Sequence, residues 1–203
     1  EAKQASIQLA ALDSVVKNQA LQAIADKLAA RASAIVEANK KDMDRSTQQN
    51  LAAPLLKRLK FDESKIQETI AGIKSLIALP EPVGQTLAAT ELDAGLELYK
   101  VSCPIGVIGV IFESRPDALV QISTLCLKSG NAALLKGGSE ALETNRILAD
   151  IIQSASEEAG IPKGWVQLLE TRDDVNQMLK LDSYIDLIIP RGSNEFVQYI
   201  MNN

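Results

Sequence analysis

The sequence contains no histidine in its 203 residues. This absence removes the most common general base and the most common metal ligand from any chemistry that these residues perform by themselves, and we expect no metal site. Cysteine is nearly as scarce, since only Cys103 and Cys126 occur and they match no CxxC motif. We expect both to be small, buried apolar residues of a cytoplasmic protein in a reducing environment.

The chain also lacks a long apolar run, a signal-peptide pattern and a block of basic residues. Its 21 basic and 26 acidic residues give a net charge of −5, whereas a surface that binds nucleic acid or an anionic membrane is basic. We therefore expect neither partner. Apolar residues are abundant at 46%, and a chain of this length and composition buries a substantial core.

Residues 1–82 are expected to form a helical lead-in. Within residues 18–43 the apolar residues recur at the spacing of one helical stripe. A second helix is expected to begin after an N-cap at Asp62 and to stop at Pro80, because the residue before a proline avoids helical backbone. Residues 46–54 are expected to be a loop, and the basic cluster at 57–60 to be solvated rather than to bind phosphate.

Residues 83–103 differ from the lead-in. A turn-like Asp93-Ala94-Gly95 separates two short stretches that show no helical face, which predicts an antiparallel hairpin. Two interpretations stay open. The hairpin is either a simple surface element, or an edge that pairs with another domain or another subunit, because an unpaired strand edge invites a partner.

Residues 104–203 alternate between short apolar runs and amphipathic segments. Strands are expected at 107–111, 132–135, 165–169 and 185–189, and helices after them from Pro116, Ser139, Asp173 and Asn194. This order predicts an α/β fold with a doubly wound, Rossmann-like parallel sheet. Ligands of such sheets bind beyond the carboxyl ends of the strands, so those ends are where a site is expected.

Two strand-to-helix junctions carry groups suited to an anion. Lys136-Gly137-Gly138-Ser139 and Arg191-Gly192-Ser193 each place a cation, glycine and a hydroxyl at a helix start, where backbone N–H groups and the helix dipole favour phosphate. Neither is a Walker A loop, and Gly106 with Gly109 does not complete the dinucleotide fingerprint. A tight turn with a helix cap is the structural alternative for each junction.

Four strings, in this order and spacing, resemble the gamma-glutamyl phosphate reductase family of the aldehyde dehydrogenase superfamily: PIGVIGVIFESRPDAL, KSGNAALLKGGSEA, VQLLETRDDV and YIDLIIPRGSNEFV. The resemblance extends to AIADKLAARASAIVEANKKDM and LLKRLKFDESKI in the lead-in. It implies that residues 1–203 form a dinucleotide-binding domain, made of the lead-in (1–82), a protruding hairpin (83–103) and the β/α core (104–203), within a homo-oligomer.

The resemblance also implies an activity. The family uses NADPH to reduce gamma-glutamyl phosphate to glutamate 5-semialdehyde and phosphate in proline biosynthesis, through a cysteine thioacyl intermediate. Its nucleophilic cysteine lies in a GICH-like motif downstream of the RGSN segment, so a catalytic domain is expected beyond residue 203. The chain itself would then hold no catalytic residue and be inactive alone.

Individual roles follow from the resemblance. Phe112 and Glu113 would contact the cofactor, and Ser114 and Arg115 the substrate. Lys136, Gly137, Gly138 and Ser139 would hold the adenosine side of NADP, and Arg191, Gly192 and Ser193 its pyrophosphate or nicotinamide side. Arg115 is favoured as an anion contact over a surface ion pair, because Pro116 fixes it at a helix entrance.

Two alternatives remain open at this stage. An NAD-dependent aldehyde dehydrogenase of the same superfamily would share the fold, but an asparagine-containing loop is expected there in place of Glu113-Ser114-Arg115. A non-catalytic dinucleotide-binding module is the other. The residues alone do not decide the cofactor, because Glu140 beside a ribose favours NAD whereas Lys136 suits a 2′-phosphate.

Overall fold

The structure is a computed structural model that describes residues 1–192 and 194–201. The first part of the chain is helical: α1 (Ala2–Ala10), α2 (Ser14–Ala30), α3 (Ala32–Gln48), α4 (Ala53–Leu59) and α5 (Glu63–Ala78). A hairpin follows, made of β1 (Thr86–Asp93) and β2 (Leu96–Val101). The remainder alternates: β3 (Val107–Ile111), α6 (Pro116–Lys128), β4 (Ala132–Lys136), the 3₁₀ turn η1 (Ser139–Ala141), α7 (Leu142–Glu158), β5 (Val166–Leu169), α8 (Arg172–Met178), β6 (Leu187–Pro190) and α9 (Asn194–Met201).

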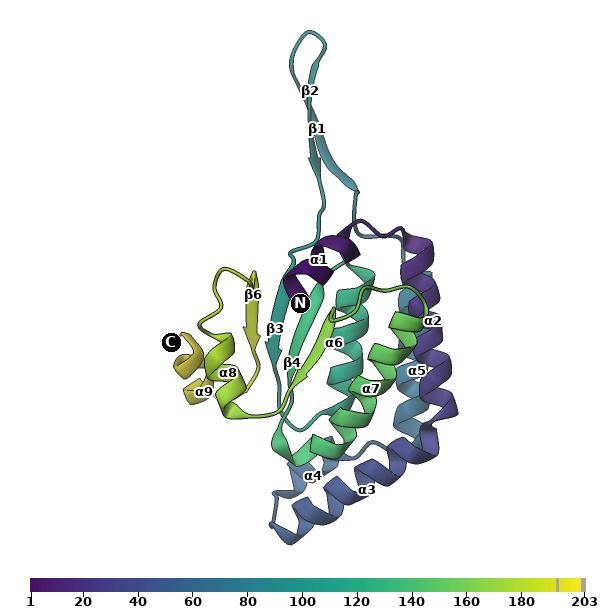
Figure 1. The fold of residues 1–203 in the computed structure, drawn as a ribbon, viewed down its shortest axis with the longest axis vertical. Coiled ribbons are helices and arrows are strands. Elements are labelled where there is room, and N and C mark those ends of the chain that lie inside the picture. Colours follow the sequence, from purple (N-terminus) through teal and green to yellow (C-terminus); the bar gives the residue numbers. More distant parts are fainter. Residues whose placement is uncertain (193, 202–203) are drawn as a thin grey trace.

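The four strands of the core form a parallel sheet in the order β5-β4-β3-β6. The chain moves outward from β3 through β4 to β5 and then crosses to the other side of β3, which is the doubly wound arrangement (Figure 1). The predicted fold class is thereby confirmed. The direction of winding reverses between β3 and β6, and this switch point is where open α/β sheets place their ligands.

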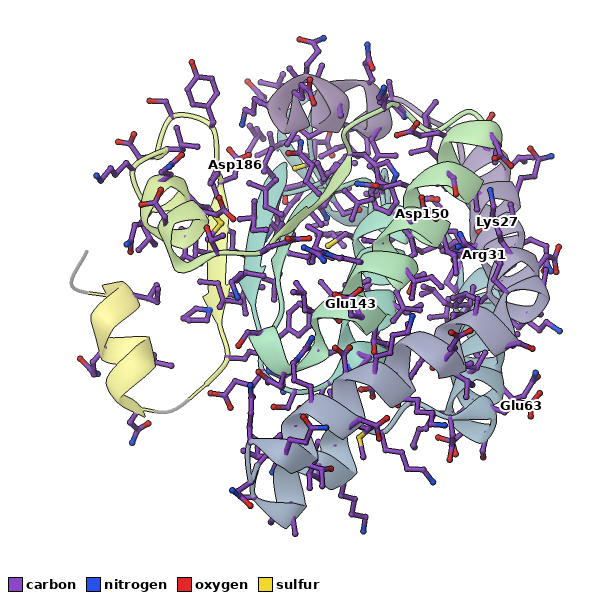
Figure 2. The ribbon with its side chains drawn as sticks, turned by 60° about the horizontal axis from the view of Figure 1, so that its bottom comes forward. Lys27, Arg31, Glu63, Glu143, Asp150 and Asp186 are labelled. Carbon is purple, nitrogen blue, oxygen red and sulfur yellow. The ribbon has the colours of Figure 1, made fainter. Side chains whose placement is uncertain are left out.

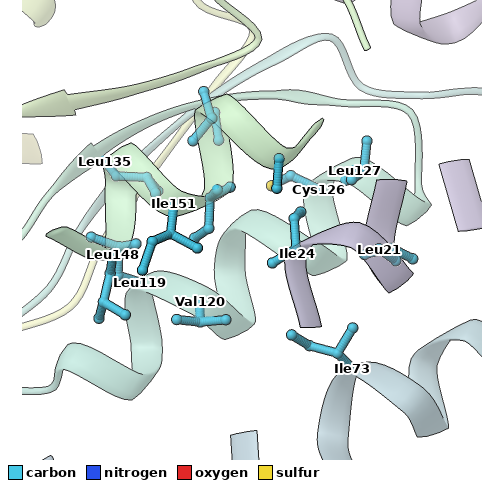
Figure 3. Close-up of a cluster of buried hydrophobic side chains, with 14 of the residues drawn as sticks. Leu21, Ile24, Ile73, Leu119, Val120, Cys126, Leu127, Leu135, Leu148 and Ile151 are labelled. Atoms are coloured by element: carbon cyan, nitrogen blue, oxygen red, sulfur yellow. The ribbon is translucent and has the colours of Figure 1, made fainter. Parts of the chain in front are cut away.

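Alternate residues of β3 face the two sides of the sheet, as the strand period of two requires. Ile108 and Val110 belong to the main hydrophobic core, whereas Val107 and Ile111 pack in a smaller cluster with Met178 of α8. The main core lies under α6 and α7 and extends to α2 and α5, as Figure 3 shows for Leu21, Ile24, Ile73, Leu119, Val120, Cys126, Leu127, Leu135, Leu148 and Ile151. The sheet is therefore well covered on the α6–α7 face and lightly covered on the other.

Local signals explain most helix ends. Asp62 caps α5 by accepting a hydrogen bond from the Lys65 N–H at 3.1 Å, and α5 ends before Pro80 as predicted. Pro116 occupies the first turn of α6. Gly130, just beyond the end of α6, has a φ of +73°, a left-handed conformation that glycine adopts without steric cost.

The single helical stripe expected over residues 18–43 is corrected to two helices, α2 and α3, which meet at Arg31. The Arg31 guanidinium pairs with Asp150 of α7 at 2.5 Å (Figure 2), and Lys27 pairs with Glu158 at 2.8 Å. The break has a packing reason, because α2 contacts α5, α6 and α7 whereas α3 contacts the start of α7 and η1. A hydrophobic stripe does not encode such a change of direction.

Smaller differences concern the ends of elements. The loop expected at 46–54 is shorter, because α3 runs to Gln48 and α4 begins at Ala53. The basic cluster at 57–60 lies in the last turn of α4 and just after it rather than in a loop. The helix expected from Ser139 opens with η1, and α7 proper starts at Leu142. None of the helices in residues 1–192 and 194–201 has the length and apolarity needed to cross a bilayer.

The predicted hairpin is present and projects away from the rest of the molecule (Figure 1). Every residue of β1 and β2 is exposed, including the large apolar side chains of Leu87, Leu92, Leu96, Leu98, Tyr99 and Val101. Cys103, at the root of the hairpin, is also exposed, so the expectation that it is buried is wrong. Cys126 is buried as expected, because it lies on the inner face of α6.

Candidate functional site

A cleft of about 680 Å³ lies at the carboxyl ends of β3, β4 and β6. The structure brings eight of the predicted site residues together in its lining: Phe112, Glu113, Ser114, Lys136, Gly137, Gly138, Ser139 and Arg191. The rest of the lining consists of Leu51, Leu55, Ile111, Glu140, Val175 and Asn176. The cleft therefore sits at the switch point between β3 and β6, where the fold predicts a ligand.

The end of β3 forms one wall of the cleft. Phe112 continues the sheet, since its N–H donates to the Lys136 carbonyl at 2.9 Å, and its ring is buried. Ser114 is also buried and has a φ of +24°. Its N–H donates to Glu140 Oε1 at 2.7 Å, and its hydroxyl donates to the same oxygen. The loop after β3 is thus hydrogen-bonded to the junction after β4.

The junction after β4 forms the adjacent wall. Lys136 Nζ donates to the Gly137 carbonyl at 2.5 Å. A Cβ on Gly137 would overlap the amide of the buried Asn145, and a Cβ on Gly138 would overlap the Glu140 carboxylate. Gly137 is therefore needed for close packing at this turn, whereas a Cβ on Gly138 would require the Glu140 carboxylate to move.

The expectation that the helix after this junction offers free N–H groups to an anion needs correction. The 3₁₀ turn η1 separates the glycines from α7. The N–H groups of Glu143 and Thr144, in the first turn of α7, donate to the buried carboxylate of Asp42 at 3.2 and 2.8 Å. A side chain of the lead-in therefore already satisfies the donors that a phosphate would use at that helix start.

The end of β6 forms the third wall of the cleft. The Arg191 N–H donates to the Ile111 carbonyl at 2.8 Å, and the Arg191 side chain is exposed and lines the cleft. Gly192 follows it directly but is not among the lining residues. Ser193 lies outside the described residues, so its predicted roles in the site and in capping α9 stay predictions.

Arg115 does not join the cleft. Its guanidinium is half exposed and pairs with Asp117 at 2.7 Å, and the hydrogen bond to that carboxylate raises the pKa of Arg115. Arg115 lines instead a separate depression between α5 and α6. The prediction that Pro116 disfavours a surface ion pair of Arg115 is therefore wrong. Pro116 starts α6, and Asp117 in the same first turn lies close enough to pair with Arg115.

Sequence reasoning missed five of the lining residues, of which Ile111 is the last residue of β3. Leu51 and Leu55 come from the segment around α4, and nothing local in the sequence marks them as part of a site. Val175 and Asn176 come from α8, which begins with a capping box between Thr171 and Asp174. The Thr171 N–H lowers the pKa of the Asp174 carboxyl, and the nearby Lys136 ammonium lowers it further. The threonine-x-x-aspartate pattern was a visible signal for this helix start.

Neither cysteine is placed as a nucleophile for this cleft. Burial raises the pKa of the Cys126 thiol to about 12, so it stays protonated at neutral pH. Cys103 precedes β3 and thus lies toward the amino ends of the strands, opposite the cleft. Among the described residues no cluster of histidine, cysteine and carboxylate side chains could hold a metal ion.

The comparisons with known proteins agree on one family. The model described as "Aldehyde dehydrogenase family" matches residues 1–203. The chain is 68% identical over 199 residues to the gamma-glutamyl phosphate reductase of Ruminiclostridium cellulolyticum, covering 98% of this chain and 46% of that protein. The enzyme of the same name from Acetivibrio thermocellus is 68% identical over 203 residues, covering 100% of this chain and 47% of that protein.

The solved structures show the same relationship. The gamma-glutamyl phosphate reductase of Thermotoga maritima superimposes with a TM-score of 0.94 at 35% identity, over 100% of this chain and 49% of that one. The structure of the Saccharomyces cerevisiae enzyme gives 0.92 at 45% identity, over 98% and 51%. The chain spans about half the length of the relatives it matches. Because the family model matches all of its residues, the chain belongs to the aldehyde dehydrogenase family.

Proposed function

We propose that the cleft binds NADPH and that the chain supplies the cofactor-binding half of a gamma-glutamyl phosphate reductase of proline biosynthesis. One observation carries the proposal: Lys136, at the end of β4, and Arg191, just after β6, reach one cleft from opposite sides of β3. Two cations at a switch point suit the phosphates of a dinucleotide. The substrate comes from the names of the relatives, and the pathway comes from the family resemblance of the sequence.

The residues present fit this cofactor. The cleft volume of about 680 Å³ is that of an ordinary small-molecule site. Leu51, Leu55 and Val175 offer an apolar surface for a flat ring. Lys136 would pair with a phosphate on the adenosine side, and Arg191 with the pyrophosphate. Gly192 and Ser193 remain proposed contacts of that second group.

The proposed reaction converts gamma-glutamyl phosphate and NADPH to glutamate 5-semialdehyde, phosphate and NADP. NADPH supplies the hydride. Phe112, Glu113 and Ser114 would line the space between cofactor and substrate. Arg115, which pairs with Asp117 outside the cleft in this structure, would leave that pair to hold a phosphate or carboxylate of the substrate. The acyl-accepting thiolate would come from a cysteine beyond Asn203, because neither cysteine of this chain reaches the cleft. Such chemistry belongs in the reducing cytoplasm.

The two rival functions predict different behaviour. An NAD-dependent aldehyde dehydrogenase would oxidise aldehydes without phosphate, and a non-catalytic module would bind the dinucleotide without turnover.

We also propose that the exposed hairpin pairs with a second copy of the chain in a homo-oligomer, since its edges and its apolar side chains have no cover within the described residues.

The test is the reverse reaction of the full-length protein, which avoids the unstable acyl phosphate. Glutamate 5-semialdehyde, phosphate and NADP should together produce NADPH, and omission of phosphate should abolish the signal. Equal turnover without phosphate would favour the aldehyde dehydrogenase. Dinucleotide binding with no turnover on any of these substrates would favour the non-catalytic module.

A further inference from the structure

Ser114 holds an unusual backbone conformation at the edge of the cleft. Its φ of +24° lies in the left-handed region, which residues with a Cβ rarely adopt. Its side chain is only 3% exposed, so solvent does not stabilise the conformation. Some specific contact must therefore offset the steric cost of this residue, which leads from β3 into α6.

The contact is the carboxylate of Glu140, which belongs to the junction after β4. Glu140 Oε1 accepts the Ser114 N–H at 2.7 Å and also the Ser114 hydroxyl. Hydrogen bonds to a charged acceptor are the stronger kind. One carboxylate oxygen thus accepts hydrogen bonds from both donors of Ser114, its N–H and its hydroxyl.

The surroundings fit this role for Glu140. The backbone of its turn is held by Arg45, which donates to the carbonyls of Ser139 and Glu140 at 3.3 and 3.4 Å. Gly138 leaves room for the carboxylate, because a Cβ at that position would occupy its place. The second glycine of the junction, Gly138, therefore leaves the space that the Glu140 side chain occupies.

We propose that Glu140 is a positioning residue that holds the loop at residues 113–115 in the conformation presented to the cleft. The inference rests on the proposed function for the role of that loop in turnover. The hydrogen bonds to Ser114 engage Oε1, so the carboxylate serves the protein's own loop rather than acting only as an acceptor for a ribose. Glu140 acts through Ser114 and not on the substrate.

The first experiment measures the loop without reference to activity. In the full-length protein, amide hydrogen exchange of Ser114 should be roughly tenfold faster in Glu140→Ala than in the wild type, because the carboxylate that accepts its N–H is removed. Glu140→Gln should keep most of the protection, since its amide oxygen still accepts both hydrogen bonds. The matched control is Glu143→Ala (Figure 2), which removes a carboxylate three residues further on. That carboxylate pairs with Arg146. Equal exchange at Ser114 in Glu140→Ala and the wild type would overturn the proposal.

The second experiment is a rescue. Glu140→Ala should lower kcat/KM for the proposed reaction roughly tenfold, the loss expected for charge-assisted hydrogen bonds. In a Ser114→Gly background the same change should cost less than about twofold, because glycine adopts the left-handed conformation unaided. Gly138→Ala should reproduce the loss while keeping the carboxylate in the chain. An equal cost of Glu140→Ala in both backgrounds would contradict the positioning role.

The two proposals fail separately. A wild-type protein that shows no NADPH-dependent turnover of the proposed substrates would contradict the proposed function. The exchange rates of Ser114 in the variants would still decide whether Glu140 holds the loop.

Discussion

The carboxylate of Asp42 accepts hydrogen bonds from both the backbone N–H and the hydroxyl of Thr144, at 2.8 and 2.7 Å, although 102 positions separate the two residues. Both are fully buried. Asn39, one turn earlier in α3, donates to the Thr144 hydroxyl and to the Leu59 carbonyl, at 3.2 and 2.9 Å. The lead-in therefore caps α7 and fixes the junction that forms one wall of the cleft.

This cap predicts a large loss of stability in Asp42→Ala. Removal of the carboxylate leaves buried donors of Thr144 without an acceptor, and also leaves Arg45 without its ion pair. We expect the free energy of unfolding to fall by about 3 kcal/mol, measured by urea denaturation. Asp44→Ala, on the exposed face of α3, is the control and should change it by less than about 0.5 kcal/mol. Similar losses in the two variants would show that the cap contributes little.

The substrate contact proposed for Arg115 makes a prediction that uses its present partner. If the guanidinium leaves Asp117 to bind a phosphate or carboxylate of the substrate, Arg115→Ala should lower kcat/KM roughly ten- to hundredfold. Asp117→Asn should instead raise kcat/KM by lowering KM for the substrate, because it weakens the competing ion pair between Arg115 and residue 117. Steady-state kinetics in the reverse direction measures both. Wild-type values in both variants would leave Arg115 as a surface arginine at the start of α6.

Asp186 predicts a pH dependence of stability. The hydrogen bond from Lys3, at 2.7 Å, and the N–H of Val107, at 2.8 Å, lower the pKa of this carboxyl in the folded protein. Since the folded pKa lies below the unfolded value of about 3.9, the contribution to stability is present above that value. It is lost as the pH falls through the folded pKa.

The measurement for Asp186 is the thermal midpoint of Asp186→Asn against the wild type at several pH values. The variant should be less stable at pH 7, and the gap should narrow at acid pH as the wild-type carboxyl is protonated. Asp182→Asn, an exposed carboxylate in the same loop, serves as the control. A gap that does not change between neutral and acid pH would contradict the assignment.

The sequence predicted the β/α order because each of its signals is local. The apolar run at 107–111, the proline that starts α6 and the glycine that ends it all act within a few residues. The break at Arg31 could not be predicted in this way, since it depends on where α3 meets α7. The exposure of Cys103 was missed for a related reason: it depends on how far the hairpin stands from the core.

In the candidate site, too, the sequence predicts what local signals determine and misses what depends on contacts between distant residues. The carboxyl ends of three neighbouring strands carry Phe112, Lys136 and Arg191, so the topology alone brings these residues to one edge of the sheet. The hydrogen bonds of Glu140 and Asp42 join residues 26 and 102 positions apart, and no spacing rule reports such pairs. Arg115 lies outside the cleft because one residue beyond Ser114 the chain already turns into α6, and the Arg115 side chain lines the depression between α5 and α6.

The central claim is that the cleft binds NADPH through Lys136, and calorimetric titration of the full-length protein tests it directly. The wild type should bind NADPH more tightly than NADH. Lys136→Ala should weaken NADPH binding roughly tenfold, the loss expected for one charge-assisted contact to a phosphate, and should reduce the preference over NADH. Lys163→Ala, an exposed lysine before β5, should bind NADPH as the wild type does. An unchanged NADPH affinity in Lys136→Ala would contradict the account.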